Sequence, residues 1–534
     1  MQIIQRISSR VKREFNLFRS HRLVRKIRKN LPNDPGEKPS KPVIFYNAST
    51  RLSGLSQNAG FSLVTSLSLR NAGIPVIHFV CHRGLSHCVL GTNRENPSDP
   101  PPCPECVRTS RLIFDGAVVE PCQMVRERRL EEELSGLSLK ELLEFDYKGF
   151  PAGKLVLPSL RWILRIHHLQ DDEGTRYLAR EYILSAWNVK QKFETILKKN
   201  DPLAVVVFNG MFYPEASARW AARQKGIPVY THEVGMLPLS AFFTEGEATA
   251  YPVDMDELFQ LSSEQDAMLD QTLEKRTKGK FVTAGVQFWP EMVELNEEIK
   301  HLVEKHDALV PVFTNVVFDT SQGHANVIFG HMFEWLDDVL KAVKNHLNTF
   351  FVIRAHPDEL RPGKESRETV SAWIEENRVK EMENVIYIAP DEYISSYDLI
   401  RRSKFVMVYN STIGLEASIM GKPVLCAGRA RYTQIPTVFF PDSKKAFKDK
   451  LNEFLDAERI GVPADFISNA RRVLYSQLFR ASLPFDDYLE EDGIWRGYVR
   501  LKNFSTNDLL PENSDVMKVL YDGIIHGKSF IMEL

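Results

Sequence analysis

Short apolar runs alternate with helical patterns along most of the chain, and this alternation predicts the fold. The apolar runs are as long as strands, and the residues between them repeat at helical spacings. The strand patterns occupy residues 41–47, 74–80, 203–209 and 227–233, and then 308–315, 350–356, 384–390, 404–410 and 422–428. Such alternation is typical of parallel sheets covered by helices on both faces. We therefore expect an α/β protein with two Rossmann-like domains facing a cleft.

Changes in composition indicate where the domains begin and end. Residues 1–41 are expected to form a basic amphipathic helix and a proline-rich linker. The first domain is expected to span residues 42–262, and it includes a Cys- and Pro-rich insertion at residues 81–126. The second domain is expected to span residues 263–480. We expect residues 481–534 to form a C-terminal extension that packs back on the first domain.

The charge is unevenly distributed. The 534 residues include 68 Lys and Arg against 70 Asp and Glu, a net charge of −2. The first thirty residues carry ten Arg and Lys and a single acid, Glu14, so this arm has a charge of +9 and the rest of the chain −11. An acidic body argues against a nucleic-acid-binding protein, and no nucleic acid partner is expected. No apolar run reaches the roughly 18 residues that span a bilayer.

The basic arm has an apolar stripe at helical spacing. The stripe consists of Ile3, Ile7, Val11, Phe15 and Phe18. Five arginines flank it: Arg6, Arg10, Arg13, Arg19 and Arg22. This pattern is typical of a helix that lies on an anionic membrane surface, so we expect residues 1–30 to contact one. A helix packed on the protein's own body, or a mitochondrial transit peptide, has the same composition.

The most specific motif follows the strand pattern at residues 404–410. It reads YNSTIGLEASIMGKPVLCAGRARY, residues 409–432. Asn410 ends the strand, and Ser411 and Thr412 lie where a helix begins, so free backbone N–H groups and hydroxyls there favour a phosphate. Glu416 lies on the same helix face and is suited to accept hydrogen bonds from ribose hydroxyls. An ordinary capping box is the alternative interpretation.

Other strand ends supply further candidates. Arg354, His356 and Pro357 belong to the sequence RAHPDE, where a strand ends with cationic groups suited to a nucleotide phosphate. Thr314 and Asn315 end the strand that opens the second domain and offer a hydroxyl and an amide. Because the carboxyl ends of neighbouring parallel strands share a crevice, these residues are expected to lie together.

In the first domain the candidate is Glu233, in the sequence THEVGM at a strand end. A carboxylate that faces a cleft and is partly desolvated can act as a general base. A plain turn with a solvated glutamate is the alternative.

Four of the six cysteines fall within residues 81–106. They are Cys81, Cys88, Cys103 and Cys106, in the pattern C-x6-C-x14-C-x2-C. A C-x2-C pair with two further thiols suits tetrahedral Zn²⁺ in a structural site, and His78, His82 or His87 could replace one thiol. Zinc is favoured over an iron–sulfur cluster, and four unligated thiols are the alternative. The low cysteine count otherwise favours a reducing cytosol.

The sequence HP after a parallel strand, followed by NSTIGLEASIMGKPV, resembles the capsule polysaccharide synthesis glycosyltransferases. This family includes bacterial Kdo transferases and, more remotely, polysialyltransferases. The resemblance covers mainly residues 308–432, and the Glu-Val-Gly turn is a looser match to the family's acidic motif. Two features depart from the family pattern: Val234 stands where a second acidic residue usually precedes glycine, and the cysteine-rich segment is not a feature expected of the Kdo enzymes.

The resemblance implies a GT-B fold and an inverting transfer without a catalytic metal. It implies a nucleotide-sugar donor in the second domain, with CMP-linked sugars among the candidate donors. It also implies an acceptor at the first domain that is a growing or lipid-linked surface glycan. His356 would contact the donor phosphate, Ser411 and Thr412 would surround it, and Glu233 would deprotonate the acceptor hydroxyl. The expected location is cytoplasmic, peripheral on the inner face of the cell membrane.

Two other functions fit the same pattern. An alditol-phosphate transferase of the teichoic-acid type would share the two domains and the phosphate site, but would transfer a phosphoalditol. A nonenzymatic scaffold that binds nucleotide sugars would use the cysteine module to recruit partners. Substitution of Glu233 and His356 distinguishes an enzyme from such a scaffold.

Overall fold

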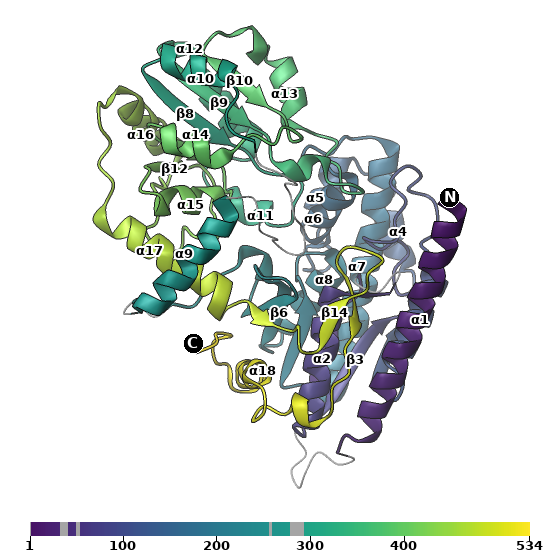
Figure 1. Cartoon of the computed structure of the whole chain (residues 1–534). Helices are drawn as coiled ribbons and strands as arrows, with labels where there is room; N and C mark the ends of the chain where they lie inside the picture. Colours follow the sequence, from purple (N-terminus) through teal and green to yellow (C-terminus); the bar gives the residue numbers. More distant parts are fainter. Residues whose placement is uncertain (1, 33–40, 50–53, 256–258, 278–292, 534) are drawn as a thin grey trace.

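The computed structural model of the chain describes residues 2–32, 41–49, 54–255, 259–277 and 293–533 (Figure 1). The side chains of residues 2–7, and with them the predicted stripe members Ile3 and Ile7, lie outside the described residues, as does most of the predicted linker. Among the described helices, none combines the length and the apolar character needed to cross a bilayer.

The first domain is built on a mixed sheet with the strand order β13-β7-β6-β5-β1-β3-β4. The strands are β1 (Val43–Tyr46), β3 (Val76–Cys81), β4 (Val118–Cys122), β5 (Ala204–Phe208), β6 (Val229–Val234), β7 (Ser240–Glu245) and β13 (Leu483–Pro484). The five strands from β6 to β4 are parallel, while β7 and β13 add an antiparallel edge. The chain runs from β1 to β3 and β4 on one side and returns to β5 and β6 on the other, so the strand order reverses between β1 and β5.

Successive residues of these strands point to opposite faces, and each face has its own core. Ile44 and Tyr46 pack with one set of helices, whereas Val43 and Phe45 pack with the other. The first set comprises α4 (Arg128–Leu134), α5 (Leu139–Glu144), α6 (Ala152–Leu164), α7 (Glu173–Asn200) and α8 (Tyr213–Arg223). The second comprises α1 (Gln2–Lys29), α2 (Gln57–Asn71) and α18 (Asp515–His526). Burial on both faces explains why the strands read as continuous apolar runs.

The second domain has a sheet in which all strands are parallel, in the order β10-β9-β8-β11-β12. Its strands are β8 (Ala308–Phe313), β9 (Thr349–Arg354), β10 (Val385–Ile388), β11 (Val406–Val408) and β12 (Val424–Cys426). Its helices are α9 (Ser263–Thr277), α10 (Glu297–Lys305), α11 (Gln322–Ala325), α12 (Met332–Asn345), α13 (Val370–Glu376), α14 (Ser396–Arg402), α15 (Ile413–Ile419) and α16 (Lys444–Asp456). The order reverses between β8 and β11. The predicted α/β fold with parallel sheets is therefore confirmed in both halves.

After α16 the chain crosses back to the first domain. Helix α17 (Ala464–Tyr475) packs against α9 and α15, and a π-helical turn at Ser476–Arg480 leads into β13. Two further strands, β14 (Leu489–Glu491) and β15 (Tyr498–Leu501), form a small antiparallel sheet with β2 (Leu55–Ser56). Residues 481–533 thus lie on the first domain, and α18 contacts α2.

The cysteine-rich segment is the main correction to the predicted organisation. Residues 81–126 contain helix α3 (Cys103–Ile113) and strand β4, which pairs in parallel with β3. The segment is therefore a β-α-β unit at the edge of the first sheet rather than a separate insertion. The prediction missed β4 because its sequence, VVEPC, contains a glutamate and a proline, and proline is tolerated on an edge strand.

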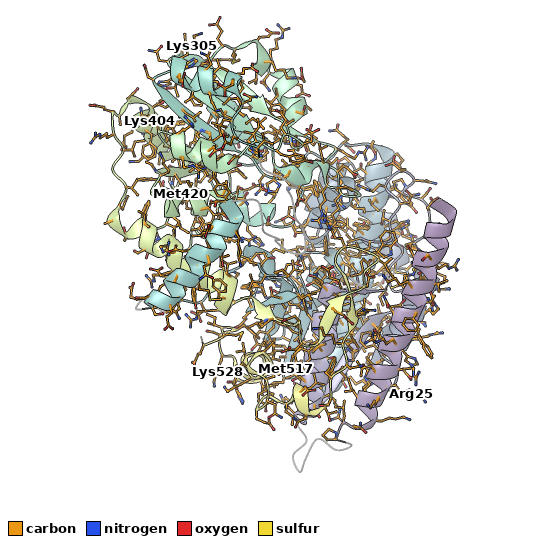
Figure 2. The ribbon with its side chains drawn as sticks, in the orientation of Figure 1. Arg25, Lys305, Lys404, Met420, Met517 and Lys528 are labelled. Atoms are coloured by element: carbon orange, nitrogen blue, oxygen red, sulfur yellow. The ribbon has the colours of Figure 1, made fainter. Side chains whose placement is uncertain are left out.

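Helix α1 lies along the outside of the first domain (Figure 1) and has two different faces. Leu17, Val24 and Ile27 are buried against the body, where α1 packs on α3 and β15. At 100° per residue, Val11, Phe15 and Phe18 lie on the opposite side of the helix. They remain 64%, 62% and 57% exposed. Arg25 also projects from the outer part of α1 (Figure 2).

Candidate active site in the interdomain cleft

A cleft of about 1080 Å³ lies between the two domains, at the carboxyl ends of both sheets. All ten residues predicted to bind the ligand or to react line it: Glu233, Thr314, Asn315, Arg354, His356, Pro357, Asn410, Ser411, Thr412 and Glu416. They come from one strand end of the first sheet and from three neighbouring strand ends of the second. The carboxyl ends of neighbouring parallel strands lie at the same edge of a sheet. A crevice that can hold a ligand forms at this edge where the strand order reverses.

Glu233 is fixed on the wall of the cleft by two asparagine amides. Asn58, on α2, donates from Nδ2 to Glu233 Oε1 at 3.0 Å, and Asn209, after β5, donates from Nδ2 to Oε2 at 2.8 Å. Burial raises the pKa of Glu233, and the nearby Asp319 carboxylate raises it further, while the two amides and the Val234 N–H oppose the rise. A carboxylate held in one orientation with a raised pKa is a competent proton acceptor.

His356 lies across the cleft, directly after β9. Its Nδ1 accepts a hydrogen bond from the Asp358 N–H at 3.1 Å, so in the neutral ring the proton is on Nε2. Burial lowers the pKa of His356, which keeps the ring neutral near pH 7. A neutral imidazole with a fixed Nε2–H can donate one hydrogen bond to an anionic oxygen in the cleft.

Asn315 and Asn410 connect the two strand ends on either side of the reversal in the second sheet. The Asn315 side-chain amide donates to Asn410 Oδ1 at 2.5 Å. Thr314 donates from its hydroxyl to the Arg354 carbonyl oxygen at 3.0 Å, which ties the end of β8 to β9. These bonds hold the loops that line the cleft in one arrangement.

Ser411 and Thr412 precede α15, and their surroundings differ from the expected helix start. Thr412 makes no side-chain capping bond, so the capping-box alternative does not describe this helix. The helix itself has only 7 residues, and a short helix contributes little dipole. An anion near Ser411 and Thr412 would therefore depend on hydroxyls and on nearby cations more than on the helix.

Arg354 and Glu416 are held by partners within the protein. The Arg354 guanidinium donates to the backbone carbonyls of Ile394 and Glu392, and burial lowers its pKa to about 10. Glu416 accepts from Arg276 Nη1 at 2.6 Å and from the Tyr397 hydroxyl. Both side chains therefore support the cleft wall. Each carboxylate oxygen of Glu416 already accepts a hydrogen bond within the protein, so a ribose hydroxyl would have to compete with Arg276 and Tyr397 for it.

The described lining residues of the cleft carry an excess of positive charge. The cationic ones are Arg276, Arg354, Arg361, Lys364, Arg429, Arg431 and Arg496, and the acidic ones are Glu233, Asp319, Asp358 and Glu416. Seven cations against four acids favour an anionic ligand. Six of these seven cations are arginines, and burial, together with the neighbouring Arg361 and Arg165, lowers the pKa of the lysine, Lys364, to about 8.

The sequence prediction missed several lining residues. Asp319, in the loop after β8, interacts electrostatically with Glu233, with His356 and with Arg431, so it lies near the middle of the cleft. Trp495 comes from the C-terminal extension, lines the cleft and is 54% exposed. Asn209 stands in the sequence FNG, directly after an apolar strand pattern. The other candidates are recognised as polar residues at strand ends, and the same pattern could have identified Asn209.

The four cysteines also converge. Cys81 ends β3, Cys88 follows in the next loop, and Cys103 and Cys106 lie in the first turn of α3. All four line one small cavity with almost wholly apolar walls. In the described part of the chain, no group of three or more His, Cys, Asp or Glu side chains has the arrangement of an assembled metal centre.

The fold and the cleft define a two-domain α/β protein with a candidate ligand site between the strand ends of both domains. Residues 273–438 match the family model described as "Capsule polysaccharide biosynthesis protein", which confirms the family resemblance predicted from the HP and NST motifs. The matched segment covers the strand ends of the second domain that line the cleft. A search of curated protein sequences found no match.

Comparison with solved structures gives distant similarities. The beta Kdo 2,4 transferase KpsC of Thermosulfurimonas dismutans is 14% identical, with 57% of this chain and 82% of that chain covered and a TM-score of 0.33. The UDP-GlcNAc 2-epimerase of Neisseria meningitidis is 12% identical, with 82% and 99% covered and a TM-score of 0.25. At these TM-scores the similarities carry no argument about this chain.

Proposed function

We propose that this protein is a capsule-type glycosyltransferase, which moves a sugar from a nucleotide-sugar donor to a hydroxyl of a growing or lipid-linked surface glycan. One observation supports this proposal above the others. Glu233, desolvated and fixed by two amides, faces a cleft whose other wall carries His356, the two hydroxyl residues and most of the cations. This is the arrangement that transfer to a hydroxyl with a phosphate leaving group needs.

The chemistry follows from these positions. Glu233 takes the proton of the acceptor hydroxyl while the acceptor oxygen bonds to the anomeric carbon of the donor sugar. The bond between that carbon and the nucleotide phosphate breaks, and the phosphate leaves with the electron pair. Nε2–H of His356, the hydroxyls of Ser411 and Thr412, and nearby cations such as Arg431 would stabilise the leaving phosphate, so no catalytic metal is required. A single displacement of this kind inverts the anomeric configuration.

The first experiment identifies the donor and tests Glu233. Thermal shifts of the full chain with CMP, UDP, GDP, dTDP and CDP should show a preference for one nucleotide, because a ligand of the native state raises apparent stability. With the matching nucleotide sugar, Glu233→Gln should lower kcat by about 10²-fold or more while nucleotide binding is retained. Glu245→Gln, an exposed carboxylate at the end of the neighbouring strand, is the matched control.

The second variant tests the proposed contact of His356 with the donor phosphate. His356→Ala should weaken nucleotide binding about tenfold, and His356→Gln, which keeps an N–H donor, should restore part of it. Full activity of the Glu233→Gln and His356→Ala double variant would refute the assignment of the site. A product heavier by a phosphoalditol would indicate the alditol-phosphate transferase, and nucleotide binding without turnover would indicate the scaffold. Retention of the anomeric configuration, measured by NMR on the product, would refute the single displacement.

We further propose that α1 docks the enzyme on the inner face of the cell membrane, where a lipid-linked acceptor would be presented. The outward stripe of Val11, Phe15 and Phe18 supports this, since the body leaves it exposed while the opposite side of α1 is packed. Arg22 lies over the Phe18 ring at 5.9 Å, so a cation accompanies the apolar group. Apolar groups beside cations suit a surface of anionic lipid.

Vesicle sedimentation tests the docking. Each exposed phenylalanine that enters the lipid contributes about 1.5–3 kcal/mol, so Phe15→Glu with Phe18→Glu should lower the affinity for phosphatidylglycerol vesicles by at least tenfold. Leu347→Glu, an exposed apolar residue of the second domain, should leave it unchanged. Turnover of a soluble acceptor should be the same in both variants. Equal sedimentation of the two variants would refute the docking surface.

A further inference from the structure

The four cysteines of the β3–α3 segment share features that the proposed reaction does not use. Cys81, Cys88, Cys103 and Cys106 come from three separate places in the chain, yet all line one cavity of about 20 Å³. A buried thiol by itself is ordinary, because cysteine packs as a small apolar side chain. The unusual feature is that four thiols from separate segments share one cavity. Their convergence therefore needs an explanation.

The chain turns tightly beside two of these sulfurs. Gly84 stands three residues after Cys81 and Gly91 three residues after Cys88, so both segments read C-x2-G. The Gly91 N–H donates to the Cys88 carbonyl oxygen at 3.1 Å, which closes one turn. A Cβ at Gly91 would lie 2.8 Å from Cys88 Sγ, so only glycine lets the backbone approach this sulfur. The residue before Gly84, Arg83, has a left-handed backbone with φ of 63°. Cys103 and Cys106 add a C-x2-C pair at the start of α3.

Arg83 also lines the cavity. A divalent cation bound by four thiolates would carry a net negative charge, and the Arg83 guanidinium would offset part of it.

We infer that Cys81, Cys88, Cys103 and Cys106 form a structural zinc site that closes the loop between β3 and α3. Binding releases the four thiol protons as Zn–S bonds form, and the segments draw inward from their thiol positions to reach tetrahedral geometry. The size of the cavity decides between metal centres. A volume of about 20 Å³ holds about one water-sized occupant, which suits a single ion and is too small for a four-iron cluster.

The site has a structural consequence for the cleft. Ser49 and Leu90 line both the cysteine cavity and the interdomain cleft, so the two share a wall. In the chain, Val89 and Leu90 are the two residues between Cys88 and Gly91. Zinc would therefore fix the loop that forms this part of the cleft on the first domain. The inference concerns the metal and stands whether or not the proposed sugar transfer is correct.

Metal analysis of the full chain, purified without chelator or affinity metal, tests the inference. Elemental analysis by mass spectrometry should find about one zinc per chain. Cys103→Ser with Cys106→Ser should lose it, whereas Cys122→Ser, a buried cysteine beside the site that does not line the cavity, should keep it. Titration of the native protein with a mercurial should release the zinc to a colorimetric indicator. This titration needs no variant to fold.

Three results would overturn the zinc site. Protein that contains no zinc and takes none up when the reduced chain is incubated with zinc chloride would show four unligated thiols. Iron with absorption in the visible range would show a cluster and refute the size argument. A mass two hydrogens lower, located by peptide mapping to Cys103 and Cys106, would show a disulfide instead.

Discussion

Asn209 offers the most direct test of how Glu233 works. Its side-chain amide donates to Glu233 Oε2 at 2.8 Å, and its backbone has φ of 59°, in the left-handed region. Alanine at this position would add backbone strain to the loss of the amide. Asn209→Gly keeps the backbone relaxed and removes the side chain, which loses the bond to Glu233 and also the bond that Asn209 Oδ1 accepts from the Met211 N–H at 3.0 Å. Only the bond to Glu233 bears on the pKa of that carboxylate.

The size of the effect follows from the hydrogen bond. A bond to a charged group contributes about 1.5–3 kcal/mol, and one pKa unit corresponds to about 1.4 kcal/mol. The amide stabilises the ionised carboxylate and so opposes the effect of burial, which raises the pKa of Glu233. Its removal should therefore raise the pKa of Glu233 by about one further unit or more. Because a base acts only when deprotonated, the acid limb of the kcat/KM profile should move to higher pH by the same amount.

The assay is the pH dependence of kcat/KM for sugar transfer. Lys148→Gly, which relaxes another left-handed residue with φ of 56° away from the cleft, controls for the change of backbone. Asn58→Ala removes the second amide, at 3.0 Å, and should shift the limb in the same direction. A profile that is lowered at every pH without moving its acid limb would refute the reasoning, since it would show that Asn209 only supports the turn.

Three further predictions concern other parts of the cleft. Arg276→Met should lower the free energy of unfolding by about 3 kcal/mol in urea titrations, because it leaves the buried Glu416 without its ion-pair partner, and adding Glu416→Gln should recover part of the loss. Trp495→Ala should raise KM for the acceptor without changing nucleotide affinity, since this exposed ring offers a flat apolar surface on the rim; an unchanged acceptor KM would exclude it from acceptor binding. Nucleotide affinity should fall as pH rises through about 8, where Lys364 loses its charge, and Lys364→Arg should flatten this dependence in calorimetric titrations.

The sequence allowed the prediction of the parts of the fold that rest on local pattern. Buried strands of parallel sheets are continuous apolar runs, and nine of them could be recognised without tertiary information. Polar residues directly after such runs are conspicuous, and parallel topology brings them to one edge. For this reason the sequence predicts that His356 and Asn410 share one edge of the second sheet, while Glu233 ends a strand of the first sheet, which faces the same cleft.

What the sequence could not show depends on contacts between distant segments. Asn58 and Asn209 reach Glu233 from α2 and from the end of β5, separated by 175 and 24 residues from it. The partners of Glu416 are likewise remote, since Arg276 lies 140 residues away on α9. Strand β4 was missed because an edge strand tolerates residues that a central strand excludes. Helix α1 has two apolar stripes, and only the folded structure shows which of them packs against the first domain.

The distribution of charge between the two walls bears on the strength of the base. Six of the seven lining cations belong to the second domain, while Glu233 stands on the first. A guanidinium beside Glu233 would favour its ionised form and make it a weaker base, whereas the electrostatic neighbour that perturbs it is the acidic Asp319. In the proposed reaction, the donor phosphates would lie against the cations of the second domain and neutralise part of their charge. For the proposed transfer, this separation of charge would let one cleft hold an anionic donor and still keep a basic carboxylate for the acceptor hydroxyl.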